Sequence, residues 1–549
     1  MEAGFNGMQV SLQKICVVSQ EWSATNKTVL QRILSNFSCL RYTRRLFTFS
    51  LCLSLIEISN FAVAGPWIEP GDEQLRHHIQ VLADAGIITV PITTWPLMWA
   101  GIKRDIDAAS RNRLSPDLLG SLNYVSFEFN EQANREQQLS YRISVSNDPN
   151  IFRDFASDQR EKYELETEYE LLGDWWAIKL DLNVVNDPLI ESDDSRFRAD
   201  GSYASAVWGN WSWTIGAIDH WWGPGWETSL ILSTSARPVP GITIQRNFSD
   251  APESKWLQWI GPWHLSAFAG KLDGGNAVTV PDAKLLGMRV GFKPLQSLEI
   301  NLSRTAQWGG DGRPQDLSSF WKMFIGKDNL DGYYDENVGG GEVRIITEED
   351  IANEPSNQLA GIDFRYNFNI AKSSNGFYGQ LIGEDESNYA PSLNTLLLGL
   401  ENSFKSQSAS HRFVFEVFDT SIDSYGDPIY NVAYRHGIYQ SGYVNKGRII
   451  GAWTDNDSRL ISLSGYHFFE SQSIGWRLGR LELNRDGNGT AHLLSPEIAT
   501  ELKTIRLDYS RYWDRIKLST SVTYNSEELT VGLNEIGKTL GQFGFEYRL

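Results

Sequence analysis

Cysteine is scarce in this chain. Only three occur among its 549 residues, as Cys16, Cys39 and Cys52. None follows position 52, so the rest of the chain has no disulfide framework and no metal centre with thiolate ligands.

Basic residues are in deficit as well. The chain has 49 Lys and Arg against 68 Asp and Glu, which gives a formal net charge of -19 at pH 7. A nucleic-acid binder gains its affinity by neutralising phosphates with Lys and Arg. The charge balance therefore excludes nucleic acid as a partner.

The signatures of common enzyme classes are missing. There is no HExxH zinc motif, no GxSxG nucleophile motif, no Walker loop and no dinucleotide fingerprint. The eight His are scattered along the chain, and His77 and His78 lie in the first predicted helix. We expect no catalytic residue, no bound metal and no cofactor.

Long apolar runs are confined to the N-terminal region. Arg41, Arg44 and Arg45 precede an apolar run, 46–63, that ends in the small-x-small pattern of a signal-peptidase site, 62–64. We predict a presequence with a signal peptide over residues 1–64, and export of the remaining chain. More residues precede Arg41 than an ordinary signal peptide has. The alternative is an N-terminal membrane anchor, for which the run is short.

After Gly65 no stretch of 18 apolar residues occurs, so no membrane-spanning helix is expected. Apolar and polar residues alternate instead. Ile178, Leu180 and Leu182 alternate with Lys179 and Asp181, and the segments 139–146, 286–302, 362–368 and 505–510 show the same period of two. Such repetition predicts a large antiparallel sheet.

A sheet with one apolar and one polar face is either a soluble sandwich or a transmembrane barrel. Charged residues at mid-strand, such as Arg289 and Arg365, suit a water-filled lumen, and aromatic residues near strand ends suit a membrane interface. The chain also ends with Phe543, Phe545 and Tyr547 at alternate positions. We therefore predict a mainly β protein whose residues 116–549 form an outer-membrane β-barrel, inserted in outer-membrane lipid by the barrel assembly machinery.

Residues 65–115 do not follow the strand pattern. Residues 71–74 are a plausible helix start, Leu75, Ile79 and Leu82 recur at helical spacing, and Gly86 ends the segment. A second, polar helix follows after Trp99. We predict a small helical unit at the periplasmic side, either an independent domain or a plug for the barrel.

Several long motifs occur in one order along the chain. They include Trp221-Trp222-Gly223-Pro224-Gly225-Trp226, Ala236-Arg237-Pro238-Val239-Pro240, the run 306–316 and the run 378–386. Together they resemble the Wzi-type outer-membrane capsule-assembly family. The resemblance implies a barrel of about 18 strands, a periplasmic helical bundle and lectin-like binding of capsular polysaccharide. The long presequence and residues 434–439 depart from the family pattern.

Carbohydrate rings have apolar faces and hydroxyl edges, so a lectin needs aromatic platforms beside polar side chains. The segment 219–227 supplies this mixture, although an aromatic girdle with a structural turn explains it equally well. The segment 308–341 is a long loop that either binds ligand or constricts the lumen. The acidic run 384–386 raises two further alternatives, a hydrolase carboxylate pair and a calcium site.

An acidic polymer would be repelled by this acidic chain unless individual Arg residues bound it. We therefore add the arginines of the family motifs and of the segments 434–439 and 447–448 to the candidates. The candidate ligand-binding residues are Asp219, His220, Trp221, Trp222, Trp226, Arg237, Trp308, Asp311, Arg313, Glu384, Asp385, Arg435 and Arg448.

These observations predict a non-enzymatic, monomeric surface lectin that anchors or organises capsular or other extracellular polysaccharide. A porin-like channel for sugars or other small solutes is the main alternative, because a barrel of this size has room for a pore unless it is plugged. A polysaccharide-processing enzyme in a barrel frame is the third possibility.

Overall fold

The computed structural model describes residues 66–549 except 134, 157–158, 187, 191–195, 275–277, 326–355, 372, 388–389, 423–425, 489–495 and 532–533. The predicted presequence and cleavage site, 1–64, lie outside the described residues. In the described part of the chain, no helix is long and apolar enough to cross a membrane.

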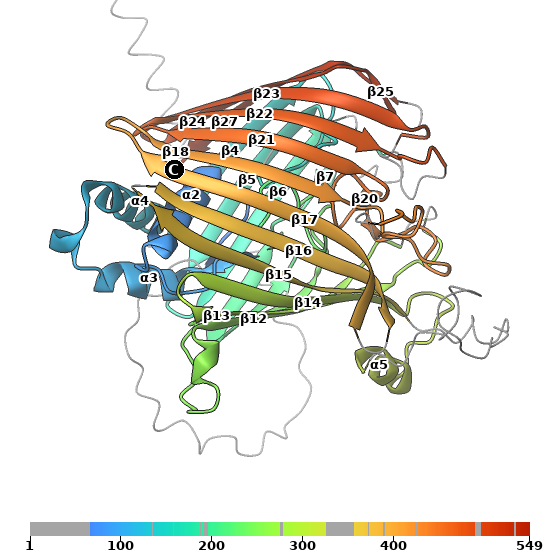
Figure 1. The fold of residues 1–549 in the computed structure, drawn as a ribbon, viewed down its shortest axis with the longest axis horizontal. Coiled ribbons are helices and arrows are strands. Elements are labelled where there is room, and N and C mark those ends of the chain that lie inside the picture. The colour runs from blue at the N-terminus through green and yellow to red at the C-terminus, as the bar shows by residue number, and fades with distance from the viewer. Residues whose placement is uncertain are drawn as a thin grey trace, which may run out of the picture. The chain divides into compact units, whose positions relative to one another are not determined.

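A closed antiparallel barrel dominates the fold (Figure 1). The short strands β7 and β8 pair with successive parts of β6, so the wall has 18 strand positions. Its strands are β4 (Gln137–Ser146), β5 (Tyr163–Leu172), β6 (Trp176–Asn186), β7 (Phe197–Arg198), β8 (Tyr203–Trp208), β9 (Trp211–Gly216), β11 (Gly241–Arg246), β12 (Trp263–Lys271), β13 (Lys284–Leu295), β14 (Leu298–Trp308), β15 (Ser356–Ile370), β16 (Ser373–Ser387), β17 (Ala390–Lys405), β18 (Ser410–Asp419), β21 (Arg459–Phe468), β22 (Gln472–Leu483), β23 (Thr500–Trp513), β24 (Ile516–Asn525) and β27 (Thr539–Arg548).

The wall is apolar on the outside and polar on the inside. On β6 the side chains of Ile178, Leu180 and Leu182 are 43%, 53% and 55% exposed, whereas Lys179 and Asp181 are buried toward the lumen. A soluble sandwich would bury the apolar face, so that alternative is wrong. The predicted transmembrane barrel is confirmed.

The last strand closes the ring. β27 pairs with β4, and the register places Phe543 opposite Val145 and Tyr547 opposite Tyr141. The described strands thus form a closed ring without an open edge, as a lipid environment requires.

The two ends of the barrel differ. Turns of a few residues, such as 173–175 and 514–515, connect strands at the end that carries the helices, and the long connections 147–162, 217–240 and 420–458 lie at the other end (Figure 1). Outer-membrane barrels have short periplasmic turns and longer extracellular loops. The helices therefore mark the periplasmic end.

Among the described residues, three helices precede the first barrel strand: α2 (Glu73–Asp84), α3 (Trp99–Ala108) and α4 (Pro116–Ala133). The Asp72 side chain caps α2 by accepting a hydrogen bond from the Leu75 amide at 2.8 Å. Leu75, Ile79 and Leu82 are fully buried in one apolar cluster with residues of α3 and α4. The boundary expected at residue 115 is wrong, because α4 extends the helical unit to Ala133.

The helical unit packs against the inner wall of the barrel. Arg365 on β15 lies 2.6 Å from Asp84 at the end of α2, and Arg412 on β18 donates to His77 Nδ1 at 3.0 Å. The Glu299 carboxylate on β14 accepts from the Ile92 and Thr93 amides at 2.9 and 3.0 Å. These contacts favour the plug over an independent domain.

The remaining short elements lie outside the wall order. They are β1 (Trp67–Ile68), β2 (Thr94–Trp95), β3 (Leu97–Met98), β10 (Trp221–Trp222), β19 (Val444–Asn445), β20 (Arg448–Ile449), β25 (Leu529–Val531), β26 (Asn534–Ile536), the 3-10 turns Arg111–Arg113 and Gln258–Ile260, and the helix α5 (Leu317–Phe324).

Candidate functional site

The loop between β9 and β11 crosses the lumen. Every described residue from 220 to 238 is buried. The Trp226 amide donates to Glu416 of β18 at 2.9 Å, and the Leu230 amide donates to Gln380 of β16 at 2.8 Å. In the wall order, β16 and β18 lie five and seven strands from β11, so this loop reaches across the barrel interior.

The aromatic motif lies inside that loop. Trp221, Trp222 and Trp226 are at most 1% exposed. Trp221 packs edge-on against Phe155 at 5.3 Å, and β10 pairs with β2 of the helical unit. No ring face is left for a sugar, so the prediction that these residues form an exposed stacking platform is wrong. Their aromatic surface stabilises the lumen filling instead.

Helix α2 holds the turn of the same motif. Arg76 donates through Nη2 to the carbonyl oxygens of Pro224, at 2.7 Å, and Gly225, at 3.0 Å. The guanidinium is buried, and burial lowers the pKa of Arg76 to about 10. The helical unit and the lumen loop therefore form one packed assembly.

The residues that flank the motif are also occupied. His220 is buried and stacks on Phe268 at 5.0 Å, and burial lowers its pKa to about 4. Arg237 is ion-paired to Asp200 at 2.7 Å. Asp219 is partly exposed, and burial raises the pKa of its carboxyl. Of these residues, Asp219 is the one that the structure leaves nearest to solvent.

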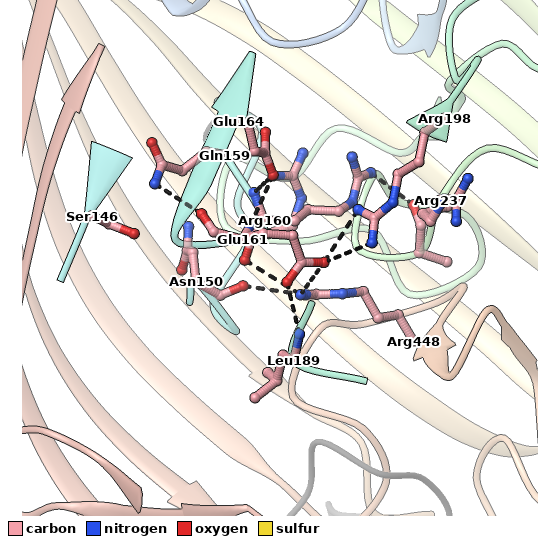
Figure 2. Close-up of polar contacts among 12 residues, drawn as sticks. Ser146, Asn150, Gln159, Arg160, Glu161, Glu164, Leu189, Arg198, Arg237 and Arg448 are labelled. Carbon is pink, nitrogen blue, oxygen red and sulfur yellow. Dashed lines mark hydrogen bonds and ion pairs between the residues drawn. The ribbon is translucent and has the colours of Figure 1, made fainter. Parts of the chain in front are cut away.

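Arg448 and Arg237 belong to a set of polar groups on the extracellular side of the lumen, which Figure 2 shows. At its centre, Glu161 accepts hydrogen bonds from Arg198 at 3.1 and 3.2 Å and from the Leu189 amide at 3.0 Å, and Arg448 Nη2 lies 3.9 Å from it. Arg160 donates to the carbonyl oxygens of residues 234 and 236 at 2.9 Å.

This arginine cluster, defined as Arg160, Arg198, Arg237 and Arg448, joins strand β7, which carries Arg198, to three different long connections. Arg448 is 2% exposed, and its Nη1 donates to the Asn150 carbonyl oxygen at 3.1 Å. Burial lowers the pKa of Arg448 to about 10. The cluster therefore locks loops together, and the prediction that Arg237 and Arg448 reach out to an acidic polymer is wrong for this arrangement.

The residues from Trp308 onward lie in two places, on the outside of the wall and at its extracellular rim. Trp308 is an outward-facing residue that packs edge-on against Phe320 of α5 at 5.5 Å. Asp311 is exposed and Arg313 partly exposed at the extracellular rim. The predicted loop 308–341 is described only to residue 325, and its remainder lies outside the described residues.

The acidic run contributes to loop anchoring. A Glu384 carboxylate oxygen accepts a hydrogen bond from the backbone amide of Tyr434. The side chains of Asp385 and Glu386 lie outside the described residues. A hydrolase pair or a calcium site there stays an untested alternative.

One set of side chains near Arg435 combines the groups that a sugar site needs. The Arg435 guanidinium donates to Asn431 Oδ1 at 2.9 Å, and Asn431 Nδ2 donates to Asp486 at 2.5 Å. The Arg485 guanidinium carbon lies 5.5 Å from the centre of the Tyr430 ring. We call these five residues the outer polar surface; all five are partly exposed.

Asp457 fixes the backbone of the outer polar surface at Asn431. Both carboxylate oxygens of Asp457 accept from the Asn431 amide, at 3.0 and 2.9 Å. Burial raises the pKa of Asp457 to about 7, and repulsion from Asp486 and Asp455 adds to the rise. The position of Asn431 thus depends on a carboxyl group that titrates near neutral pH.

In the described residues, one set of three carboxylates has oxygen atoms close enough to one another to hold a metal ion. The set consists of Glu166, Glu168 and Asp181. Lys179 lies 3.1 Å from Glu168 and 4.0 Å from Asp181, and Arg142 lies 3.2 Å from Glu166. These cations already balance the carboxylates, so the geometry is that of an ion-pair network in the lumen.

Sequence reasoning found one member of the outer polar surface, Arg435, and missed Tyr430, Asn431, Arg485 and Asp486. Two sequence features point to these residues. Tyr430 and Asn431 are adjacent and lie just before Arg435, and the run 484–488 is rich in turn-forming residues. Nothing in the sequence shows that these two segments meet.

Comparison with known proteins gives a consistent result. Residues 132–537 match the family described as capsule assembly protein Wzi. The solved structure of Wzi, an outer-membrane protein involved in group 1 capsule assembly in Escherichia coli and a carbohydrate-binding β-barrel, superposes with a TM-score of 0.73 at 28% identity, over 87% of this chain and 99% of that one.

A relative from Klebsiella pneumoniae is similar in sequence. It is an uncharacterized 55.8 kDa protein in the cps region, 37% identical over 335 residues. The match spans 60% of this chain and 60% of the length of that relative.

Proposed function

Because the chain belongs to the Wzi family of capsule assembly proteins, we propose that it is a lectin of the bacterial surface that binds exported capsular or extracellular polysaccharide. The protein is an outer-membrane β-barrel. Its binding function rests on the carbohydrate binding of the similar Escherichia coli protein.

The filled lumen is the observation that carries the proposal. The buried run 220–238 and helix α2 occupy the interior, and the arginine cluster ties the loops above them. A sugar porin needs a continuous aqueous path through the barrel. The interior is instead packed with buried side chains, which favours binding at the outer end over transport.

The polymer then meets the protein at its extracellular loops. The outer polar surface offers the Tyr430 ring as an apolar platform and Arg435, Asn431 and Asp486 as hydrogen-bonding groups. Arg435, which is partly exposed on this surface, suits an acidic sugar, because a guanidinium binds a carboxylate in a bidentate manner. Asp311 and Arg313 at the rim extend the same end of the molecule.

The test compares polymer retention in matched variants. Tyr430→Ala and Arg435→Ala should each weaken polymer binding roughly tenfold, since side chains at the centre of binding sites contribute about 1–4 kcal/mol. Arg104→Ala, an exposed arginine on the periplasmic α3, is the control. Surface-retained and shed polysaccharide are measured after barrel levels have been equalised. Wild-type retention by both variants would remove the outer polar surface from the proposal.

The remaining parts of the proposal concern reaction and assembly. The protein is non-enzymatic and monomeric, has no nucleic-acid partner, and enters outer-membrane lipid through the barrel assembly machinery. Incubating purified protein with polymer and analysing chain length tests the first point, since shortened products would show a hydrolase. Mass measurement in detergent tests the second.

A further inference from the structure

A short helix lies on the outside of the barrel wall. Arg304, an outward-facing residue of β14, donates to the carbonyl oxygens of Met323 and Phe324 at 2.9 and 3.0 Å, at the C-terminal end of α5. The Phe320 ring of α5 packs against Trp308. Helix α5 is thus fixed against the wall beside the extracellular end of β14 (Figure 1).

Helix α5 has apolar residues on the side that packs against the wall and an apolar stripe on its exposed side. Met323 is 3% exposed and faces the wall. Leu317, Trp321 and Phe324 are 81%, 56% and 48% exposed, and their spacing puts them on one stripe. Ser318 and Lys322 are exposed beside this stripe, so the helix is amphipathic, and its exposed apolar stripe requires an apolar environment.

The exposed stripe continues the lipid-facing surface of the wall. On the two strands next to α5, the facing outward residues Leu302 and Ile362 are 51% and 44% exposed. Two residues further along β14, a rise of about 7 Å, the outward position changes to Arg304, which bonds Gln358 of β15 at 2.7 Å. Arg304 thus interrupts the apolar outward positions of the wall, and α5 lies over this interruption.

We propose that α5 is an interfacial helix whose exposed stripe, Leu317, Trp321 and Phe324, inserts into the acyl-chain boundary of the outer leaflet. Trp is enriched at this depth, and amphipathic helices lie in the interface plane. Lys322 is exposed on the same helix and suits anionic lipid headgroups.

Exposed tryptophans also lie at the periplasmic end of the same wall sector. Trp256 and Trp259, in the connection before β12, are 88% and 64% exposed. The Trp259 ring packs edge-on against the outward-facing Phe292 of β13 at 6.2 Å. One sector of the barrel therefore has an aromatic anchor at each membrane boundary.

Spin labelling of the full barrel in bilayers containing lipopolysaccharide tests the proposal. With the three native cysteines changed to Ser, a nitroxide is placed at Trp321→Cys, at Leu302→Cys as the lipid control and at Gln440→Cys, an exposed loop position, as the water control. Relaxation by oxygen reports lipid, and relaxation by a water-soluble nickel chelate reports water.

We expect the oxygen-to-nickel accessibility ratio at Trp321→Cys to approach that at Leu302→Cys and to exceed that at Gln440→Cys. A ratio equal to the water control would overturn the proposal. Dipolar broadening between labels at Trp321→Cys would also overturn it, because the occupant would then be a second copy of the chain. Adding Arg304→Gln should raise the mobility of the label, since the helix loses its attachment to β14.

Discussion

The Arg76 guanidinium lies 4.2 Å from the centre of the Trp226 ring, and this contact joins a helix before the first barrel strand to the loop that crosses the lumen. The cation and the indole face attract each other strongly when water is excluded. The helical unit and the lumen loop should therefore lose stability together.

Replacing Arg76 by Ala should lower the free energy of unfolding by about 1–3 kcal/mol, because the carbonyl oxygens of Pro224 and Gly225 lose their buried donor. The measurement is the temperature at which the folded, heat-modifiable band converts to the unfolded one. Asp107→Ala, a change at an exposed position of α3, should leave that temperature unaltered. Equal behaviour of the two variants would contradict the coupling.

Trp222→Ala should destabilise the barrel by about 3–5 kcal/mol, since a large side chain with no exposed area leaves a cavity. Denaturant titration of the purified variant gives the value. Trp256→Ala, whose side chain is 88% exposed, is the matched control and should cost little. If Trp222→Ala unfolds like the wild type but sheds polymer, the original stacking hypothesis for this residue returns.

The intact protein should conduct poorly in planar bilayers, because the buried run 220–238 fills the lumen. Exchanging residues 221–232 for a Gly-Ser segment of the same length should open a path and raise single-channel conductance. Barrels of 16–18 strands leave an aqueous channel when nothing fills them. Large, stable channels from the unchanged protein would support the porin alternative instead.

The region around Asn431 should be less stable at pH 8 than at pH 5. The pKa of Asp457 is about 7 in the fold and lies above the ordinary value of 3.8, so the folded state holds a proton that the unfolded state releases between these values. Stability is therefore lost as the pH rises through 7. Hydrogen exchange of the Asn431 amide, corrected for its intrinsic rate, measures the change. Asp457→Asn should remove the pH dependence, and a dependence that survives this change must come from another group.

The wall of the barrel could be predicted from the sequence because each strand carries its own orientation. Ile178 and Lys179 must face opposite sides of a sheet, whatever the neighbouring strands are. A lumen lined with Lys, Asp and Arg and an exterior lined with Ile and Leu then follow from the period of two. The helix that begins at Glu73 can likewise be predicted, from its N-cap residue and from the helical spacing of its apolar residues.

The candidate site could not be predicted in the same way. The residues around a tryptophan in a turn do not indicate whether its side chain lies in the lumen or at the surface. The sequence around Trp222 is therefore compatible with both a sugar-binding platform and a packed interior. Arg485 and Tyr430 meet only because two long loops fold over the same end of the barrel. The packing of Trp308 against α5 is equally non-local, because no sequence pattern indicates a helix on the outer face of the wall.

The pairing of β27 with β4 has a consequence for assembly. These two strands come from opposite ends of the barrel sequence, so the ring cannot be completed before the whole chain has reached the membrane. Helices α2 to α4 precede β4 in the chain and are available before any wall exists. The helical unit of this protein can therefore fold before the ring closes around it.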